Sequence, residues 1–251
     1  MTRTLRLDDV EIKITLDKPQ IDRAMRELGL SDDRPRWLIH FCEDVTAAAG
    51  AGTPLFDLGL VLRARGKPGE PDDTTVKLRP CRRSQLTDHW LAVEKADGVE
   101  VKVEADWAGS GHKLAVSCTA DRSTDLVRAV GQGEQLIEAL FHDEQIAFLR
   151  ECFSPTVNLA ELTLLPPVTA MRWKKSDVAP EDLKLRAERW IVDDLDFLEL
   201  SIVAPAEQAR AKQAALTGFV QSLGFTVDPT PEPKTGRVIA HLVDKMIAGA
   251  V

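Results

Sequence analysis

Polar and aliphatic residues alternate without a break over residues 9–16, which read DVEIKITL. Successive side chains of a β-strand point to opposite faces, so this period of two predicts a strand with one apolar face. The alternation recurs, and it predicts further strands at residues 62–65, 75–79, 99–104, 170–174, 183–186 and 197–202. A continuous apolar run at 37–41 is interpreted as one more strand. Strands therefore dominate the predicted architecture.

Helical patterns interrupt the strands in three places and recur near the end of the chain. The first occupies about residues 17–29, with a proline in its first turn and a glycine at its end. The second begins at Ser123 and is expected to break at the glycines of 131–133, and the third follows Pro205. A short helix is expected at 238–247. The loops between these elements are too short to separate domains, so residues 1–251 are predicted to form a single α+β domain.

The polar faces of the predicted strands are unusually ionic, and each favours one sign of charge. Arg63 and Arg65 share a face, and so do Lys77 and Arg79. Other faces carry Asp9, Glu11 and Lys13; Glu100, Lys102, Glu104 and Asp106; and Arg172 and Lys174. A solvated face is the commoner explanation for any one strand. The repetition over most strands instead favours a closed antiparallel β-tunnel of about eight strands, with charges inside and helices packed outside.

Charges inside such a sheet are unfavourable unless they are paired or meet a ligand. A triphosphate accompanied by divalent metal ions satisfies both signs of charge. Arginine and lysine side chains take phosphate oxygens, and carboxylates hold Mg²⁺ or Mn²⁺ through their oxygens. The strand faces therefore favour a triphosphate-containing small molecule as the partner.

The overall charge argues against several other partners. Acidic residues outnumber basic ones by 40 to 32, which gives a net charge of −8. Nucleic-acid proteins present a basic surface, so no nucleic-acid partner is expected. The four cysteines contain no C-x-x-C pair, which gives no support to a zinc ribbon and is typical of a reducing compartment. With no apolar signal-peptide core and no membrane-spanning run, a cytoplasmic protein is expected.

The order of these motifs resembles the CYTH family of triphosphate tunnel metalloenzymes, which includes class IV adenylyl cyclases, thiamine triphosphatases and inorganic triphosphatases. The family's opening E-x-E-x-K is matched by Asp9-Val10-Glu11-Ile12-Lys13. Its L-R-x-R strand is matched by residues 62–65, and its T-x-K strand by residues 75–77. The stretch 193–203 is similar to the late strand that carries an E-x-E pair. The resemblance extends from Asp9 to about residue 247.

The resemblance implies a metal-dependent phosphohydrolase that acts on inorganic tripolyphosphate or on an organic or nucleoside triphosphate in a cationic tunnel. Mg²⁺ or Mn²⁺ is the implied cofactor, and its expected ligands are Asp9, Glu11, Glu104 and Glu199. The expected phosphate-binding residues are Lys13, Arg63, Arg65, Lys77, Arg79 and Arg172. Glu11, Lys13 and Glu199 are the expected catalytic residues.

Two departures from the family pattern keep alternatives open. Asp9 replaces the first glutamate of the opening motif, and Ser201 replaces the second acid of E-x-E. Loss of a carboxylate weakens a hard-cation site, so a non-catalytic triphosphate- or nucleotide-binding protein is one alternative. A class IV-type adenylyl cyclase that makes cyclic AMP from ATP is another, because both reactions use the same clamp. The sequence identifies neither the triphosphate nor the oligomeric state, although homodimers are common among such barrels.

Overall fold

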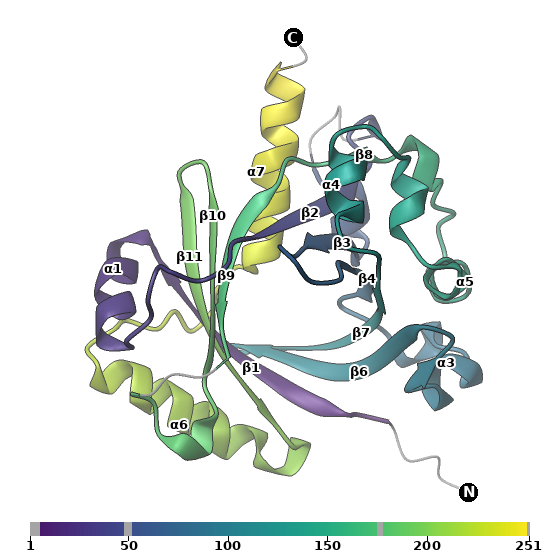
Figure 1. Ribbon diagram of the computed structural model, residues 1–251. Coiled ribbons are helices and arrows are strands. Elements are labelled where there is room, and N and C mark those ends of the chain that lie inside the picture. Colours follow the sequence, from purple (N-terminus) through teal and green to yellow (C-terminus); the bar gives the residue numbers. More distant parts are fainter. Residues whose placement is uncertain (1–5, 48–51, 175–177, 250–251) are drawn as a thin grey trace, which may run out of the picture. The chain divides into compact units, whose positions relative to one another are not determined.

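The computed structural model describes residues 6–47, 52–174 and 178–249 (Figure 1). The chain divides into two compact units that are interleaved in sequence. The first unit comprises Met1–Arg36, Glu104–Lys113 and Thr169–Lys234, and the second comprises Trp37–Val103, Leu114–Val168 and Thr235–Val251. The prediction of one domain over residues 1–251 stays a prediction.

Nine strands form a continuous hydrogen-bonded ring. In chain order they are β1 (Asp9–Asp17), β2 (Trp37–Glu43), β3 (Leu60–Gly66), β4 (Asp73–Leu78), β6 (Val99–Ala108), β7 (Gly111–Asp121), β9 (Val168–Trp173), β10 (Arg186–Val192) and β11 (Leu195–Ala204). Neighbours follow the order β1-β11-β10-β9-β2-β3-β4-β7-β6, and β6 also pairs with β1, so the strand order closes on itself. The short strands β5 (Lys95–Ala96) and β8 (Thr163–Leu164) pair with β6 and β2. The α+β fold with a closed sheet is therefore confirmed.

Two details of the predicted sheet are wrong. The ring has nine strands rather than eight, and β1 pairs with β6 in parallel, so the sheet is mixed rather than purely antiparallel. The additional strand is β7, which follows β6 through a tight turn at Gly109 and Ser110. Its first three residues are exposed, and its later polar positions include Ser117 and Thr119, so its alternation is weak.

The strand predicted at 183–186 is also wrong in position. Residues Glu181–Leu183 form a 3₁₀ turn, η5, and Lys184 has a positive φ of 47°. Strand β10 begins only at Arg186. Leu183 and Leu185 are both buried, so the turn produces the same apolar spacing as a strand. The other predicted strands overlap the observed ones.

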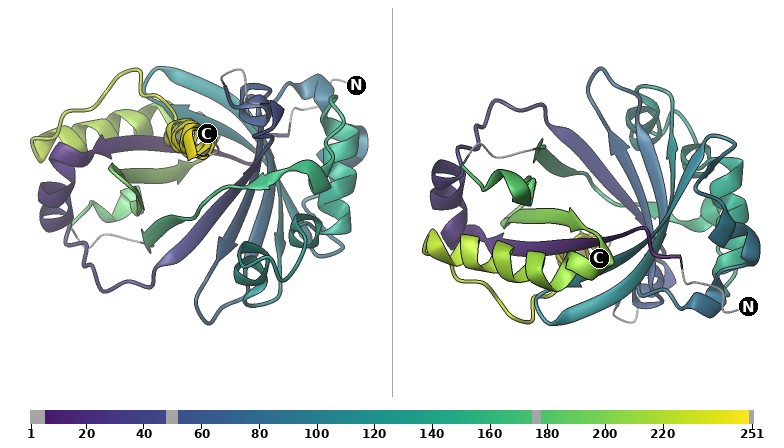
Figure 2. Two further views of the ribbon diagram at one scale, coloured as in Figure 1. Left: turned by 90° about the horizontal axis from the view of Figure 1, so that it is seen from above. Right: turned by 90° about the horizontal axis from the view of Figure 1, so that it is seen from below.

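Helices α1 (Lys18–Glu27) and α6 (Ala209–Ser222) cover the apolar face of β1 and β11 in the first unit. Figure 2 shows the purple α1 and the yellow-green α6 next to each other beside these strands. The α1 helix has a proline in its first turn and ends before Gly29, as predicted. The buried residues of α1 pack against the apolar, helix-facing residues of the strands, among them Ile12, Leu198 and Leu200.

The second unit has its own core, covered by several short helices. They are α2 (Pro54–Asp57), α3 (Asp88–Ala92), α4 (Leu126–Gly131), η3 (Ile137–Leu140) and α5 (Asp143–Cys152). The predicted break near 131–133 separates α4 from η3. Phe148 of α5 lies in one buried cluster with Leu62, Val76 and Val116 of the strands. The last helix, α7 (Lys234–Gly249), contains the helix predicted at 238–247.

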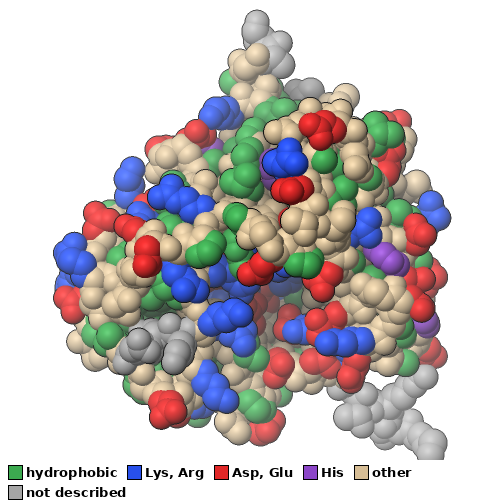
Figure 3. All heavy atoms as spheres, viewed as in Figure 1, with side chains coloured by type: hydrophobic (Ala, Val, Ile, Leu, Met, Phe, Trp, Pro, Cys, Tyr) green, Lys and Arg blue, Asp and Glu red, His purple; other side chains and the backbone are tan. Residues whose placement is uncertain are grey.

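The charged strand faces lie opposite these cores. In β1, Val10, Ile12 and Ile14 are buried, whereas Glu11 and Lys13 are only partly buried. On the face of the molecule in Figure 3, acidic and basic side chains are interspersed rather than separated by sign. No helix among the described residues is both long enough and apolar enough to cross a membrane.

Candidate functional site: two carboxylate pairs and a basic cluster

The first carboxylate pair joins β1 to β6 in the first unit. Glu11 is aligned with Asp106 in the parallel pairing of these strands. Lys13 Nζ lies 2.7 Å from Glu11 Oε2 and 3.2 Å from Asp106 Oδ1. Burial acts to lower the pKa of Lys13, but the charges of Glu11, Asp106 and Glu199 outweigh burial and raise this pKa above its usual value. Lys13 is therefore a permanent cation between carboxylates.

The second pair joins β10 to β11. Glu188 and Glu199 are directly opposite each other in the antiparallel register. Lys234 Nζ lies 3.1 Å from Glu199 Oε1 and 3.5 Å from Glu188 Oε2. The same ammonium lies 4.1 Å from the centre of the Trp190 ring. Both carboxylate pairs of the first unit thus hold a lysine ammonium.

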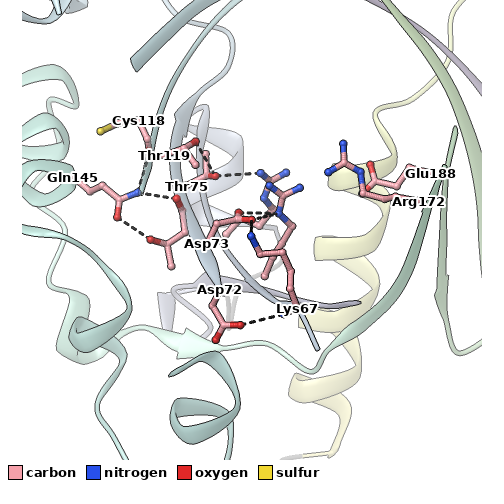
Figure 4. Close-up of polar contacts among 12 residues, drawn as sticks. Lys67, Asp72, Asp73, Thr75, Cys118, Thr119, Gln145, Arg172 and Glu188 are labelled. Atoms are coloured by element: carbon pink, nitrogen blue, oxygen red, sulfur yellow. Dashed lines mark hydrogen bonds and ion pairs between the residues drawn. The ribbon is translucent and has the colours of Figure 1, made fainter. Parts of the chain in front are cut away.

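The remaining predicted residues of the first unit surround these pairs. Arg172 on β9 is aligned with Glu188, and its Nε lies 3.9 Å from Glu188 Oε1 (Figure 4). Asp9 is aligned with Glu104 in the β1–β6 pairing. Ser201 is aligned with Lys13 on β1, so the position where the family has an acid faces a lysine here.

The second unit carries basic side chains on β3 and β4 and on the residues that follow each strand, and Figure 4 shows Lys67 beside Asp73. Arg63 Nη2 donates to Thr75 Oγ1 at 3.1 Å, and Thr75 Oγ1 lies 3.2 Å from Thr119 Oγ1. Arg65 Nε donates to Asp73 Oδ1 at 2.8 Å. We call the side chains of Arg63, Arg65, Lys67, Lys77 and Arg79 the basic cluster.

Asp73 is the carboxylate that joins Arg65 to Lys67. Lys67 Nζ lies 3.2 Å from Asp73 Oδ2, and Arg65 Nε also donates to this oxygen at 3.1 Å. Burial acts to raise the pKa of Asp73, but Arg65, Arg63 and Lys67 outweigh it and hold this pKa below its usual value. The Arg65 guanidinium also lies 5.5 Å from the centre of the Trp37 ring. These contacts hold the Arg65 side chain in place.

Lys77 lies on β4, and Arg79 follows the end of this strand. The β4 register places Lys77 opposite Val61 on β3 and opposite Ser117 on β7, two residues along from the Arg63–Thr75 pair. Lys77 therefore shares a face with Thr75. Arg79 follows the end of β4, and its backbone N–H donates to Gly59 O at 2.7 Å.

The sequence prediction did not include five residues of these clusters among its site residues: Lys67, Asp73, Asp106, Glu188 and Lys234. Lys67 and Asp73 lie outside the predicted strands. Glu188 was missed because the strand that carries it was predicted too early in the chain. Asp106 belongs to a charged face that was recognised, but the family motif does not include it. Lys234 follows the proline-rich segment 228–233 and has no periodic neighbours, so no local pattern could have revealed it.

The donor chemistry fits a divalent metal ion. Among the described residues, no three His, Cys, Asp or Glu side chains already converge as a metal-binding group. Magnesium commonly uses only one or two carboxylates and completes its shell with water and substrate phosphates. The pairs Glu11–Asp106 and Glu188–Glu199 provide such carboxylates.

Two of the solved structures that are similar to this chain illustrate the likeness. One is a candidate adenylate cyclase from Bacillus halodurans, with 14% identity, a TM-score of 0.57, and coverage of 93% of this chain and 98% of the other. The second is HpAC1 from Hippeastrum, a candidate adenylyl cyclase with a dominant triphosphatase activity. It has 14% identity, a TM-score of 0.58, and coverage of 90% and 93% of the two chains. The chain has the CYTH fold.

The likeness is one of structure and not of sequence. No family model matches the chain. No curated protein matches its sequence either. The likeness therefore shows the fold alone.

Proposed function

We propose that this chain is a metal-dependent phosphohydrolase that acts on a triphosphate. The observation that carries the proposal is that the strands supply both cationic and anionic side chains. Arg63 and Arg65 lie on β3 and Lys77 on β4. Glu11, Asp106, Glu188 and Glu199 are contributed by β1, β6, β10 and β11. Both sets lie on strand faces opposite the apolar cores. A chain of phosphates with a divalent ion requires these two kinds of group.

In the proposed reaction the basic cluster binds and orients the phosphate chain. Arg63 and Arg65 offer planar guanidinium groups, which match phosphate oxygens in pairs, and Lys13, Lys77, Arg79 and Arg172 add positive charge. Glu11, Asp106, Glu188 and Glu199, with Asp9 and Glu104 beside them, are the residues that hold Mg²⁺ or Mn²⁺. When bound, the metal offsets phosphoryl charge and acidifies a water molecule. Such chemistry depends on positioning and electrostatics, so no nucleophilic side chain is needed.

Cyclisation of ATP is the second candidate, because the two similar structures are described as candidate cyclases. HpAC1 is at the same time described as dominated by triphosphatase activity, which supports hydrolysis as the first choice. A cytoplasmic location is proposed because all four cysteines are buried free thiols. A homodimer stays a proposal.

The test is phosphate release from tripolyphosphate, ATP and thiamine triphosphate, each with Mg²⁺, Mn²⁺ or excess EDTA. We expect metal-dependent release from at least one substrate, with no cyclic AMP from ATP. Arg63→Gln is expected to abolish it, whereas Arg128→Gln, which removes an exposed arginine of the same unit, is its matched control. Cyclic AMP as the main product would replace hydrolysis by cyclisation. A folded protein without turnover on any substrate would contradict both.

A further inference from the structure

Lys234 occupies the second carboxylate pair. Only 6% of its side chain is exposed, and its ammonium contacts both Glu188 and Glu199 while lying over Trp190. The electrostatic interaction of a buried lysine with two carboxylates is stronger than that of a surface ion pair, because all three charged groups have lost much of their hydration. The position of the Lys234 ammonium marks the place where Glu188 and Glu199 together stabilise a positive charge.

The segment before Lys234 is anchored rather than loosely attached. Prolines occupy positions 229, 231 and 233, and they restrict the backbone. Pro229 O accepts the Ser110 N–H at 2.7 Å, and the Thr230 N–H donates to Asp228 Oδ1 at 2.8 Å. The backbone before Lys234 is therefore restrained, so little conformational entropy is lost when the ammonium contacts the carboxylates.

Glu188 and Glu199 would repel each other more strongly without this ammonium, which lies closer to the pair than the Arg172 Nε at 3.9 Å from Glu188. Like charges directly opposite on neighbouring strands are destabilising. With Lys234 the three charges sum to −1, and without it the pair carries −2. We propose that Lys234 is an internal cation which competes with a divalent metal ion for Glu188 and Glu199. This inference rests on the proposed function, because the metal concerned is the one that hydrolysis requires.

Two consequences follow from competition at a shared pair of ligands. A neutral residue at 234 leaves both carboxylates to the metal, so metal affinity rises. The same change leaves the carboxylates opposed in metal-free protein, so the metal-free form melts at a lower temperature and gains more from metal. A lysine that only filled space would produce neither effect.

The experiment is a titration of the full chain with Mn²⁺, followed by electron paramagnetic resonance of the free ion, with melting temperatures in EDTA and in Mn²⁺. Lys234→Met is expected to bind Mn²⁺ roughly tenfold more tightly than the wild type. Lys234→Gln keeps a polar side chain, carries the same expectation and serves if the methionine variant does not fold. Lys212→Met is the matched control, because Lys212 pairs with Asp182 at 3.0 Å, and its Mn²⁺ affinity should equal that of the wild type.

The double variant Lys234→Met with Glu188→Gln is expected to lose the tighter Mn²⁺ binding of Lys234→Met. This result would show that the added Mn²⁺ affinity comes from the Glu188–Glu199 pair. Unchanged or weaker Mn²⁺ binding in both Lys234 variants would overturn the inference, even in an active triphosphatase. Tighter Mn²⁺ binding in a protein that hydrolyses no triphosphate would uphold the inference and contradict the proposed function instead.

Discussion

Glu188 on β10 is aligned with Glu199 on β11, and the ammonium of Lys234 lies within 3.5 Å of both side chains. This relationship changes the interpretation of Ser201. The sequence indicated that an acid was missing at 201, yet a second carboxylate stands beside Glu199 on the neighbouring strand. Ser201 itself is aligned with Lys13. The proposed metal site therefore contains two carboxylates without an acid at 201.

Glu188→Gln and Glu199→Gln are expected to lower phosphate release by roughly 100-fold or more, because each removes a proposed metal ligand without changing the volume of the side chain. Ser201→Ala is expected to stay within about twofold of the wild type, since it removes no charge from the pair. Initial rates at saturating Mg²⁺ measure this. The matched control is Glu207→Gln, which neutralises an exposed glutamate of the same unit. A large loss in Ser201→Ala with normal rates in Glu188→Gln would reverse the assignment.

Arg63→Lys is expected to raise KM for the triphosphate by roughly tenfold while the protein keeps its fold, because an ammonium cannot make the paired contacts of a guanidinium. Arg63 Nη2 already donates to Thr75 Oγ1, which orients the group. Both Arg63→Lys and the surface variant Arg128→Lys keep the positive charge. Steady-state kinetics of the two variants therefore measure the loss of the guanidinium geometry at position 63. Equal KM values in both variants would show that Arg63 does not contact substrate.

Asp73→Asn is expected to lower stability at neutral pH and to weaken the acid dependence of unfolding. The folded pKa of Asp73 is depressed, so its contribution is complete above the unfolded pKa and is lost as pH falls through the folded pKa. Urea unfolding of both proteins between neutral pH and pH of about 3 measures this. The difference between wild type and variant should shrink toward low pH. A difference that stays constant with pH would show that the effect of Asp73 is not electrostatic.

Gly109→Ala is expected to destabilise the protein by more than Gly69→Ala does. Both glycines have positive φ, so alanine introduces backbone strain of about 1 kcal/mol at either site. A Cβ at Gly109 would also lie 2.2 Å from Pro229 O, whereas a Cβ at Gly69 would meet nothing within 4 Å. Equal urea midpoints for the two variants would mean that the turn between β6 and β7 does not hold the 228–233 segment.

Local periodicity was sufficient where the two faces of a strand differ strongly. In β1 the aliphatic residues Val10, Ile12 and Ile14 pack in the core and the ionic residues do not, so the sequence alone predicted both the strand and its faces. It was insufficient for β7, whose polar face includes the small residues Ser117 and Thr119. It also misled at 183–186, because Leu183 and Leu185 are buried on either side of a left-handed turn at Lys184.

The site was predictable only where its residues belong to strand patterns. Glu11, Lys13, Arg63 and Arg65 follow from the alternation and from the resemblance. The contact of Lys234 with Glu188 and Glu199 joins the first residue of α7 to two strands over a separation of more than thirty residues, and no periodic pattern encodes such a contact. The parallel pairing of β1 with β6, which brings Asp106 to Lys13, is non-local in the same sense.

Calorimetric titration with tripolyphosphate measures triphosphate binding whether or not turnover follows. We expect one site per chain, affinity at least roughly tenfold higher than for orthophosphate, a further increase with Mg²⁺, and loss of binding in the Arg63→Gln, Arg65→Gln double variant. Folded protein that gives no heat with tripolyphosphate, or that binds orthophosphate equally well, would contradict the proposed triphosphate site.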